Sequence, residues 1–476
     1  MEERSMSHTA PVDAPAPPRR WTALALLSLA QFMLIVDLTV VQVALPSIGA
    51  DLGLGRAALT WVVTTYTLMF GGLLVFGGRL ADALGARRTL LTGLAVFTAA
   101  SLLAGVASSG AVLILARGLQ GLGAALLSPA ALSIITTTFH GRERTRALGV
   151  WAAIGGGGAA LGVLLSGLLT AGPGWAWVFF VNVPVGLVIA VAVPAVVRAD
   201  DAPRRGGLDL PGAVLVTLST GALIYALVNA GDGGWTSAGT VLAGLGALLG
   251  YGLFVLVESR SATPLMRPAT LARRPVLSGT LLMVVATGLM LGLFFLTSLY
   301  FQHLRGFGPL RTGLLFLPVA IAITVGAQLA VHLIGRVGGR VVAVVATLVT
   351  AAGLALLTGI SADGNIYTEV LPGLTLAAFG IGPLFVTATS TTLANVPHGE
   401  AGVASGVINT GHELGGSIGV AAVSTVAAAG ISAVPSVAAF GAGYLMFAVV
   451  AVVLAAVAVV LVPPGRPAGT VGHGHG

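Results

Sequence analysis

The sequence predicts an all-α membrane protein with fourteen spans, built as two six-helix bundles plus two additional transmembrane helices, with both termini in the cytoplasm. Three observations support this fold class. Only 8% of the 476 residues are charged and the mean hydropathy is +1.00, whereas a soluble domain carries roughly a quarter charged residues. Apolar blocks of about 20 residues, the length that crosses a bilayer, recur along the chain. Arginine is concentrated in every second loop between these blocks.

The predicted spans end at charged residues or at Pro and Gly. In the first half the breaks are DLGLGR, GGRLADALGARR, GVASSG, FHGRERTR and AGPG, and in the second half RGFGPLR, RVGGR, SADGN, NVPHGE and ISAVPS. No cleavable signal is evident before the first span, which we expect to direct insertion. The spans are 21–45, 58–80, 89–108, 111–138, 146–171, 175–197, 209–230, 236–257, 276–301, 311–335, 340–360, 367–395, 401–430 and 437–462.

The distribution of basic residues predicts the orientation. With fourteen spans, the loops and tails on the side of the N-terminus hold 19 of the 23 arginines and the opposite side holds three. The remaining one, Arg117, lies inside a span. Because positively charged loops stay in the cytoplasm, both tails are expected there. The excess of arginine that gives the pI near 10.7 is therefore explained by membrane orientation, and a nucleic-acid partner is not needed to explain it.

Charged breaks divide the chain into five regions. We expect a cytoplasmic N-terminal tail at 1–20, a six-helix bundle at 21–198, a linker with two extra transmembrane helices at 199–275, a second six-helix bundle at 276–463 and a cytoplasmic tail at 464–476. Repeated bundles with a site between them are typical of secondary transporters.

Several chemistries are excluded by composition. The chain has no lysine, so it has no Walker A loop. It has no cysteine, which excludes disulfides and thiolate-held metals. The G-x-G-x-x-A spacing at Gly155, Gly157 and Ala160 lies in an apolar helix without a preceding strand, which argues against a dinucleotide site. No nucleophile–base pair is evident. We therefore expect neither a cofactor, a metal nor an enzymatic activity.

Five segments stand out against this apolar background. They are VDLTVVQVALPSI at 36–48, GGRLADALGARR at 77–88, RGLQGLGAA at 117–125, WAWVFFVNVPVG at 175–186 and AGVASGVINTGHELGGSIGVA at 401–421. Together they resemble the 14-helix drug:proton antiporter branch of the major facilitator superfamily, over nearly the whole chain. The resemblance implies the major facilitator fold and proton-driven drug efflux. The Arg-only, Ala- and Gly-rich usage suggests a high-GC bacterium and an antibiotic efflux transporter of actinobacterial type.

Some positions depart from this resemblance. Val163 stands where the antiporter motif of the fifth helix has proline, and Ser166 stands where it has glycine. Ala83 and Ala86 replace basic residues of the loop motif, and Gln42 replaces a common asparagine. A facilitator without proton coupling therefore stays an alternative.

Asp37 and Arg117 are opposite charges inside predicted spans. A charge there costs about 2.5–3.5 kcal/mol on insertion scales, so it points to a function. Asp37 lies roughly 13 Å, and Arg117 about 10 Å, from the outer ends of their helices. At similar depths they can neutralise each other across a water-filled cavity, with Asp37 as proton carrier and Arg117 tuning it. The alternative is a static ion pair between helices.

The second bundle has its own polar group. Glu413 lies near mid-span and can bind a cationic substrate or a second proton; a polar patch near a helix break is equally open. We expect substrate contacts at Gln42, Gln120, Asn409 and His412, which lie in the motif segments. For Gln120 the resemblance implies a cavity position, and an interhelical hydrogen bond is the alternative. His412 and Glu413 point roughly 100° apart and should not both face the cavity squarely.

The loop between the second and third spans holds further candidates. The resemblance implies a gate latch, formed by Gly78, Arg79, Asp82, Gly85, Arg87 and Arg88. The glycines would permit a tight turn. An ordinary basic loop that fixes topology is the alternative. Elsewhere, Asp209 is expected to cap the seventh helix, and Asn182 and Pro184 to kink and pack the sixth.

The predicted function is proton-coupled efflux of apolar or cationic drugs across the bacterial cytoplasmic membrane by alternating access. The alternatives are export of an endogenous metabolite, peptide, siderophore or amino acid, and facilitated transport without protons. The partners are the small-molecule substrate, protons and the lipid bilayer. The sequence leaves oligomeric state open, with a monomer expected.

Overall fold

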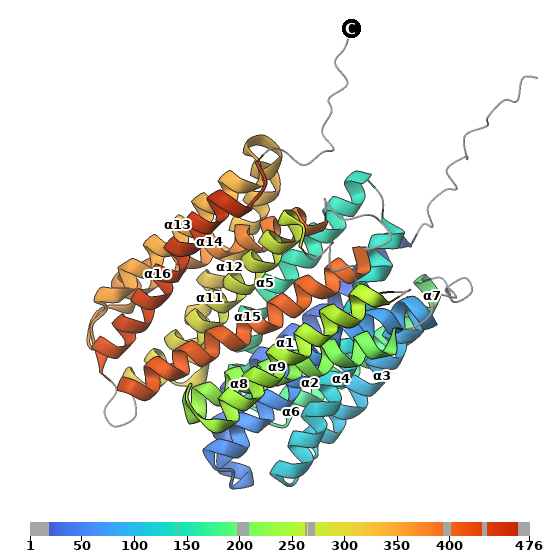
Figure 1. Ribbon diagram of the computed structural model, residues 1–476. Coiled ribbons are helices and arrows are strands. Elements are labelled where there is room, and N and C mark those ends of the chain that lie inside the picture. Colours follow the sequence, from blue (N-terminus) through green and yellow to red (C-terminus); the bar gives the residue numbers. More distant parts are fainter. Residues whose placement is uncertain are drawn as a thin grey trace, which may run out of the picture.

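A computed structural model describes residues 19–139, 141–197, 209–261, 264, 272–393, 401–430 and 436–464. These residues form helices throughout, without a strand (Figure 1). The α-helices are α1 (Arg20–Leu52), α2 (Arg56–Leu84), α3 (Ala86–Gly105), α4 (Gly110–Thr138), α5 (Gly141–Ala171), α6 (Trp177–Phe180), α7 (Asn182–Val196), α8 (Leu210–Gly233), α9 (Ala238–Arg260), α11 (Arg274–Leu299), α12 (Pro309–Val337), α13 (Gly339–Leu356), α14 (Leu371–Leu393), α15 (Ala401–Gly430) and α16 (Val437–Leu461).

The helices coincide with the predicted spans, and the sixth span is divided into α6 and α7. Single π-helical turns extend α11 at Tyr300–Leu304 and precede α14 at Ile366–Val370. Twelve helical segments in the described residues are long and apolar enough to cross a membrane. The two predicted spans that are not among them are α5 and α15, of 31 and 30 residues. Each contains residues whose side chains lie outside the described set.

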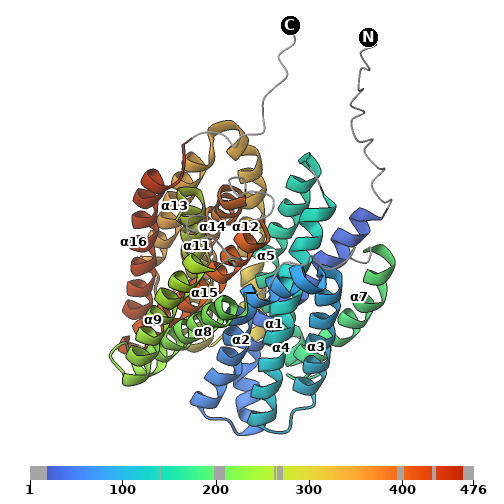
Figure 2. The same cartoon turned by 45° about the vertical axis from the view of Figure 1, so that its right-hand side comes forward.

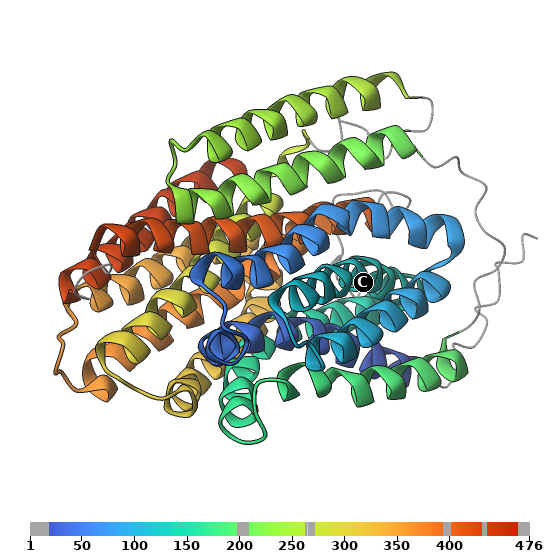
Figure 3. The same cartoon turned by 90° about the horizontal axis from the view of Figure 1, so that it is seen from below.

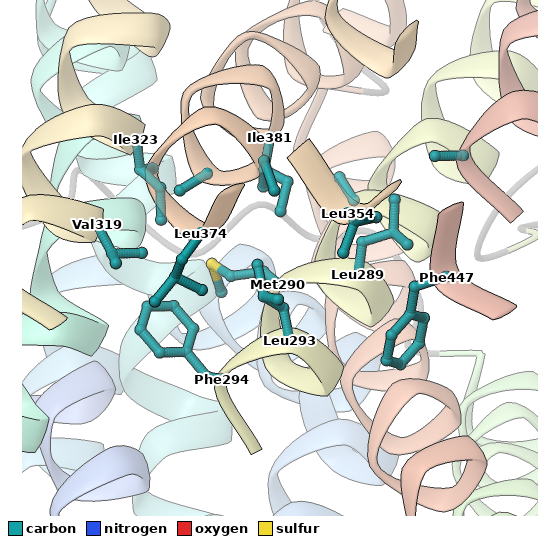
Figure 4. Packing of buried hydrophobic residues seen from close by; sticks show 14 of the residues in the cluster. Leu289, Met290, Leu293, Phe294, Val319, Ile323, Leu354, Leu374, Ile381 and Phe447 are labelled. Carbon is teal, nitrogen blue, oxygen red and sulfur yellow. The ribbon is translucent and has the colours of Figure 1, made fainter. Parts of the chain in front are cut away.

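Two bundles divide the apolar core. In the first, α4 packs against α2 and α3, and α1 packs against α5 and α7. In the second, α11 packs against α15 and α14, and α13 packs against α14 and α16. One buried cluster draws only on the second bundle, and Figure 4 shows Leu289, Met290, Leu293 and Phe294 of α11 within it.

The bundles meet along two seams. At one, α5 packs against α12, and at the other α2 packs against α15 (Figure 2). Helix α8 packs on both α2 and α15, and α9 packs on α8 (Figure 3). The two extra helices therefore form a layer outside the second seam, and α8 covers it.

Local sequence explains the helix ends. The side chain of Asp209 accepts a hydrogen bond from the backbone N–H of Gly212 at 2.9 Å, which confirms its predicted role as the cap of α8. Between α2 and α3, Gly85 has φ 96° and ψ 138°, a conformation that residues with a Cβ rarely adopt. The predicted turn therefore depends on this glycine.

Gly78 has a different role from the one predicted. It lies within α2, which continues to Leu84, so it does not form the turn. A Cβ there would lie 3.7 Å from the Cβ of Pro129 on α4, an ordinary contact. Its neighbour Gly77 is the close-packing position, because a Cβ there would fall on the backbone carbonyl of Ala125.

Candidate functional site

Helices α1 and α4 bring a carboxylate and a guanidinium together inside the first bundle. Arg117 Nη1 donates to Asp37 Oδ2 at 2.5 Å, and both side chains are 0% exposed. A buried ion pair of this kind is stable only when the remaining polar atoms are also hydrogen-bonded. The hydrogen bonds around the pair therefore decide whether it is a fixed structural contact or a group that can exchange a proton.

Two neutral side chains complete the shell around Asp37, and a third supports one of them. Its Oδ1 accepts from Gln120 Nε2 at 3.0 Å and from Asn182 Nδ2 at 2.8 Å. Gln120 in turn accepts from Arg117 Nη1 at 2.9 Å and donates to Ser101 Oγ at 2.8 Å. All are at most 2% exposed. Three helices of the first bundle, α1, α4 and α7, thus meet at one carboxylate, which accepts three N–H groups, and α3 joins them through Ser101. Such networks hold a fixed geometry.

The guanidinium of Arg117 also contacts α2. Its Nε donates to the carbonyl of Val62 at 3.2 Å, and its Cζ lies 4.2 Å from the centroid of the Tyr66 ring. A cation over an aromatic face is stabilised by the ring quadrupole. Two polar atoms of this cluster, Arg117 Nη2 and the Tyr66 hydroxyl, have no hydrogen-bond partner among the described residues.

The geometry corrects one expectation. We expected Asp37 and Arg117 to face each other across a water-filled cavity. Instead they touch, and neither lines the cavity that lies between the bundles. Gln120, expected on the cavity wall, is also buried in this cluster and makes interhelical hydrogen bonds. In the conformation described, the cluster is sealed.

The cavity itself has a volume of about 120 Å³ and lies between the bundles. Its wall comes from α1, α2, α4 and α5 on one side and from α11, α14 and α15 on the other. The aromatic lining residues are Phe70, Trp151 and Phe385, and the polar ones are Gln31, Thr39, Ser128, Thr389, Asn409, His412 and Glu413. A largely apolar cavity with a few polar groups is typical of small-molecule sites.

Glu413 is the acid of this cavity. Its residue is 6% exposed, and the side chain packs against Gly71 of α2, across the seam between the bundles. The structure shows no hydrogen bond or ion pair from its carboxyl group to the described residues. An unpaired carboxyl in an apolar wall is costly as an anion. The group is therefore placed to gain a cationic or proton partner from the cavity.

Two other predicted residues of α15 line the same cavity. His412 Nδ1 lies 3.0 Å from Thr287 Oγ1, and Asn409 Nδ2 has no partner among the described residues. His412 and Glu413 are neighbours in the sequence, and both contribute to the cavity wall.

The gate candidates lie at the ends of α2 and α3, away from the cavity. Arg79 Nη2 donates to the carbonyl of Pro264 at 2.8 Å, so it holds the segment that follows α9 rather than a neighbouring helix of its bundle. Asp82 and Arg87 each have an interaction partner, and Arg88 is exposed. The side chains of Gln42 and Val163 lie outside the described residues.

Sequence reasoning missed several residues of both sites. Asn182 was attributed to kinking and packing, but its side chain also donates to Asp37 from the first residue of α7. Gln31 lines the cavity and accepts from Ser128 Oγ at 3.0 Å. A polar residue six positions before Asp37 was an available signal for Gln31. Tyr66 offered none, because one tyrosine in an apolar helix is unremarkable.

A metal centre is not indicated by the side chains that the structure describes. Among them, no group of three or more His, Asp or Glu residues lies close enough together to hold an ion.

Comparison with known proteins agrees with this architecture. Residues 27–420 match the Major Facilitator Superfamily. The puromycin resistance protein Pur8 of Streptomyces alboniger is 42% identical over 86% of this chain and 82% of its own length. The cephamycin export protein CmcT of Amycolatopsis lactamdurans is 39% identical over 87% of this chain and 86% of its own. The lincomycin resistance protein of Streptomyces lincolnensis is 37% identical over 84% and 83%.

A solved structure shows the same fold at much lower identity. The human organic anion transporter MFSD10 superimposes with a TM-score of 0.63 and 15% identity, over 92% of this chain and 100% of that one. At this identity the likeness supports the fold alone.

Proposed function

Because the chain belongs to the major facilitator superfamily, we propose that it exports antibiotic-like small molecules across the cytoplasmic membrane of a bacterium, in exchange for protons. The observation that carries this proposal is the unpaired carboxyl of Glu413 in the cavity between the two bundles. Curated relatives named for puromycin resistance and cephamycin export support the class of substrate. Membership of this family indicates a membrane transporter rather than an enzyme.

The cavity favours an amphiphilic, cationic substrate. Aromatic and aliphatic side chains form most of its wall, and Glu413 provides one negative charge when ionised. A cation would neutralise that charge, while Gln31 and Asn409 can hydrogen-bond to polar groups of the substrate. A proton competes for the same carboxyl. Mutually exclusive binding of a proton and a cation at one acid is the simplest physical basis for exchange.

Alternating access fits the two seams. We propose that the bundles rock about the cavity, so that the contacts of α5 with α12 and of α2 with α15 open in turn. Repeat bundles around a central site move in this way in secondary transporters. The latch residues Gly78, Arg79, Asp82, Gly85, Arg87 and Arg88 would then stabilise one closed state.

We propose fourteen spans with both termini in the cytoplasm, and five regions bounded at 20, 198, 275 and 463. Helices α5 and α15 complete the count, since 31 and 30 residues extend about 45 Å, longer than the roughly 30 Å hydrocarbon core. Each packs against helices of both bundles. The arginine distribution supports the cytoplasmic placement.

The stoichiometry sets what can drive transport. Exchange of one monocation for one proton moves no net charge, so only the pH difference drives it, by about tenfold in concentration per pH unit. Exchange of a neutral compound for one proton gains a further 2.3 kcal/mol or so per 100 mV. Export of an endogenous metabolite would use the same cavity, and only the substrate differs.

The test uses everted membrane vesicles with an imposed pH gradient and a pH-sensitive dye. Puromycin, lincomycin or a neutral control compound is then added. Only a transported compound should cause protons to leave the vesicles. Glu413→Gln should abolish substrate-induced proton release while the protein stays folded in the membrane. Puromycin uptake that is independent of the pH gradient in the wild type would refute proton exchange and favour a facilitator. Val163 and Ser166, which stand in place of the proline and glycine of the antiporter motif, are compatible with that alternative.

A further inference from the structure

The structure leaves a gap between its two acids. Glu413 lines the cavity, while Asp37 is 0% exposed and does not. No hydrogen bond connects the two carboxyl groups through the described residues. If Asp37 exchanges a proton with the cavity, some group must lie between the two acids and carry it.

Tyr66 of α2 lies next to the Asp37 cluster and next to a residue of the cavity wall. Its ring lies beneath the guanidinium of Arg117, at 4.2 Å from the centroid, and so belongs to the Asp37 cluster. One turn further along α2, the ring of Phe70 lies 5.7 Å from the Tyr66 ring and lines the cavity. The next residue, Gly71, contacts the side chain of Glu413.

The charged groups that act on the Tyr66 phenol come from three helices. They are Asp37 of α1, Arg117 of α4 and Glu413 of α15. The phenol is thus within electrostatic reach of both carboxyl groups and of the cation that neutralises one of them. Phe179, on the other side of Arg117, carries no titratable group.

The hydroxyl of Tyr66 has no structural use in this conformation. The residue is 0% exposed, and its oxygen has no hydrogen-bond partner among the described residues. A buried hydroxyl without a partner destabilises the folded state. Phenylalanine would keep the packing and the ring beneath Arg117 without this cost.

We propose that Tyr66 is the proton relay between Glu413 in the cavity and Asp37 in the sealed cluster. The protonated carboxyl of Glu413 gives its proton to the Tyr66 oxygen, while the Tyr66 hydroxyl gives its own proton to the Asp37 carboxylate. Glu413 becomes an anion, Asp37 becomes neutral and the phenol is unchanged. The inference rests on the proposed proton exchange and assigns its internal path.

The transfer has a mechanical consequence. When Asp37 is neutral, Arg117 loses its ion-pair partner, and its unpartnered Nη2 is already free to bond elsewhere. The cluster that joins helices α1, α2, α3, α4 and α7 then weakens at the moment when Glu413 is charged and can bind a cation. Protonation of the cluster and substrate binding are thereby linked.

The experiment compares wild type, Tyr66→Phe and Tyr444→Phe in proteoliposomes. Tyr444 is a buried tyrosine of the second bundle whose hydroxyl lies 3.0 Å from Thr297 Oγ1, so its variant controls for loss of a buried hydroxyl. Two rates are measured with labelled puromycin and the membrane potential clamped at zero. One is exchange at equal pH, which needs no net proton transfer, and the other is accumulation driven by a pH gradient.

The relay predicts that Tyr66→Phe retains puromycin exchange and thermal stability in detergent but loses pH-driven accumulation by about 100-fold, the lower range for a positioned proton-transfer group. Tyr444→Phe should accumulate puromycin as wild type does. Full accumulation by Tyr66→Phe would overturn the relay alone. Loss of exchange and accumulation together would also overturn it, in favour of a packing role. A wild type that accumulates puromycin regardless of pH would overturn the proposed function, and the relay with it.

Discussion

Replacing Asp37 by asparagine tests the description of the sealed cluster. The substitution keeps the size of the side chain and removes its charge. Arg117, which is 0% exposed, would then lie in the interior without a counter-ion. One of the two oxygens would become an NH₂ group facing donors, since Arg117, Gln120 and Asn182 all donate to this carboxylate.

The expected cost follows from these contacts. Removing one partner of a buried ion pair costs about 3–5 kcal/mol of folding free energy, because the other charge stays buried. A misdirected amide adds about 1–3 kcal/mol when it leaves a donor unsatisfied. We therefore expect Asp37→Asn to lower the free energy of unfolding by at least about 3 kcal/mol. In Asp37→Asn/Arg117→Gln both charges are absent, and the loss should be about 2 kcal/mol smaller than the sum of the single losses.

The assay is unfolding of the purified protein in mixed micelles titrated with SDS, followed by the fluorescence of its six tryptophans. Asp51→Asn is the matched control, because Asp51 is exposed and its bond from Trp175 Nε1 at 2.8 Å lies at the surface. A loss below about 1 kcal/mol for Asp37→Asn, equal to that of the control, would refute the reasoning. Transport by Asp37→Asn must accordingly be measured per folded molecule.

Three further predictions use the same unfolding assay, with transport added for the first. Glu413→Gln should change stability by less than about 1 kcal/mol, since its carboxyl has no partner to lose, yet abolish puromycin-induced proton release. Gly77→Ala should cost about 1–3 kcal/mol because the new methyl group falls on the carbonyl of Ala125, while Gly78→Ala should stay within about 0.5 kcal/mol; equal losses would contradict the packing described. Gly85→Ala should cost about 1–3 kcal/mol through backbone strain at φ 96°, and an unchanged midpoint would show that the turn relaxes freely.

The helices and their order could be predicted from the sequence because each apolar block is bounded by charged or Pro/Gly residues. In a bilayer the backbone must be hydrogen-bonded within each span, so a block of that length has few alternatives to a helix. A kink was expected at Asn182 and Pro184 in the sixth span, and the helix is interrupted there at Val181, between α6 and α7.

The approach of Asp37 to Arg117 was also predictable, since two opposite charges at similar depth in one bundle have few other partners. Whether water separates them was not, because that depends on packing from residues distant in sequence. Asn182 and Gln120 reach Asp37 from 145 and 83 residues away. Such contacts depend on how each helix is rotated about its own axis. A sequence that is apolar on all sides of a helix gives little information about that rotation.

The layer formed by α8 and α9 has a consequence for how the two bundles can move. Helix α8 touches both α2 and α15, so any separation of these two helices breaks its contact with one of them. The bundle that keeps α8 then carries α9 with it, and α9 presents Leu242, Leu248 and Leu249 outward, each 69–74% exposed. In the alternating access that we propose, the bundle that keeps α8 and α9 is therefore the wider of the two bodies. The narrower bundle meets less viscous drag from the lipid, so we expect it to make most of the movement.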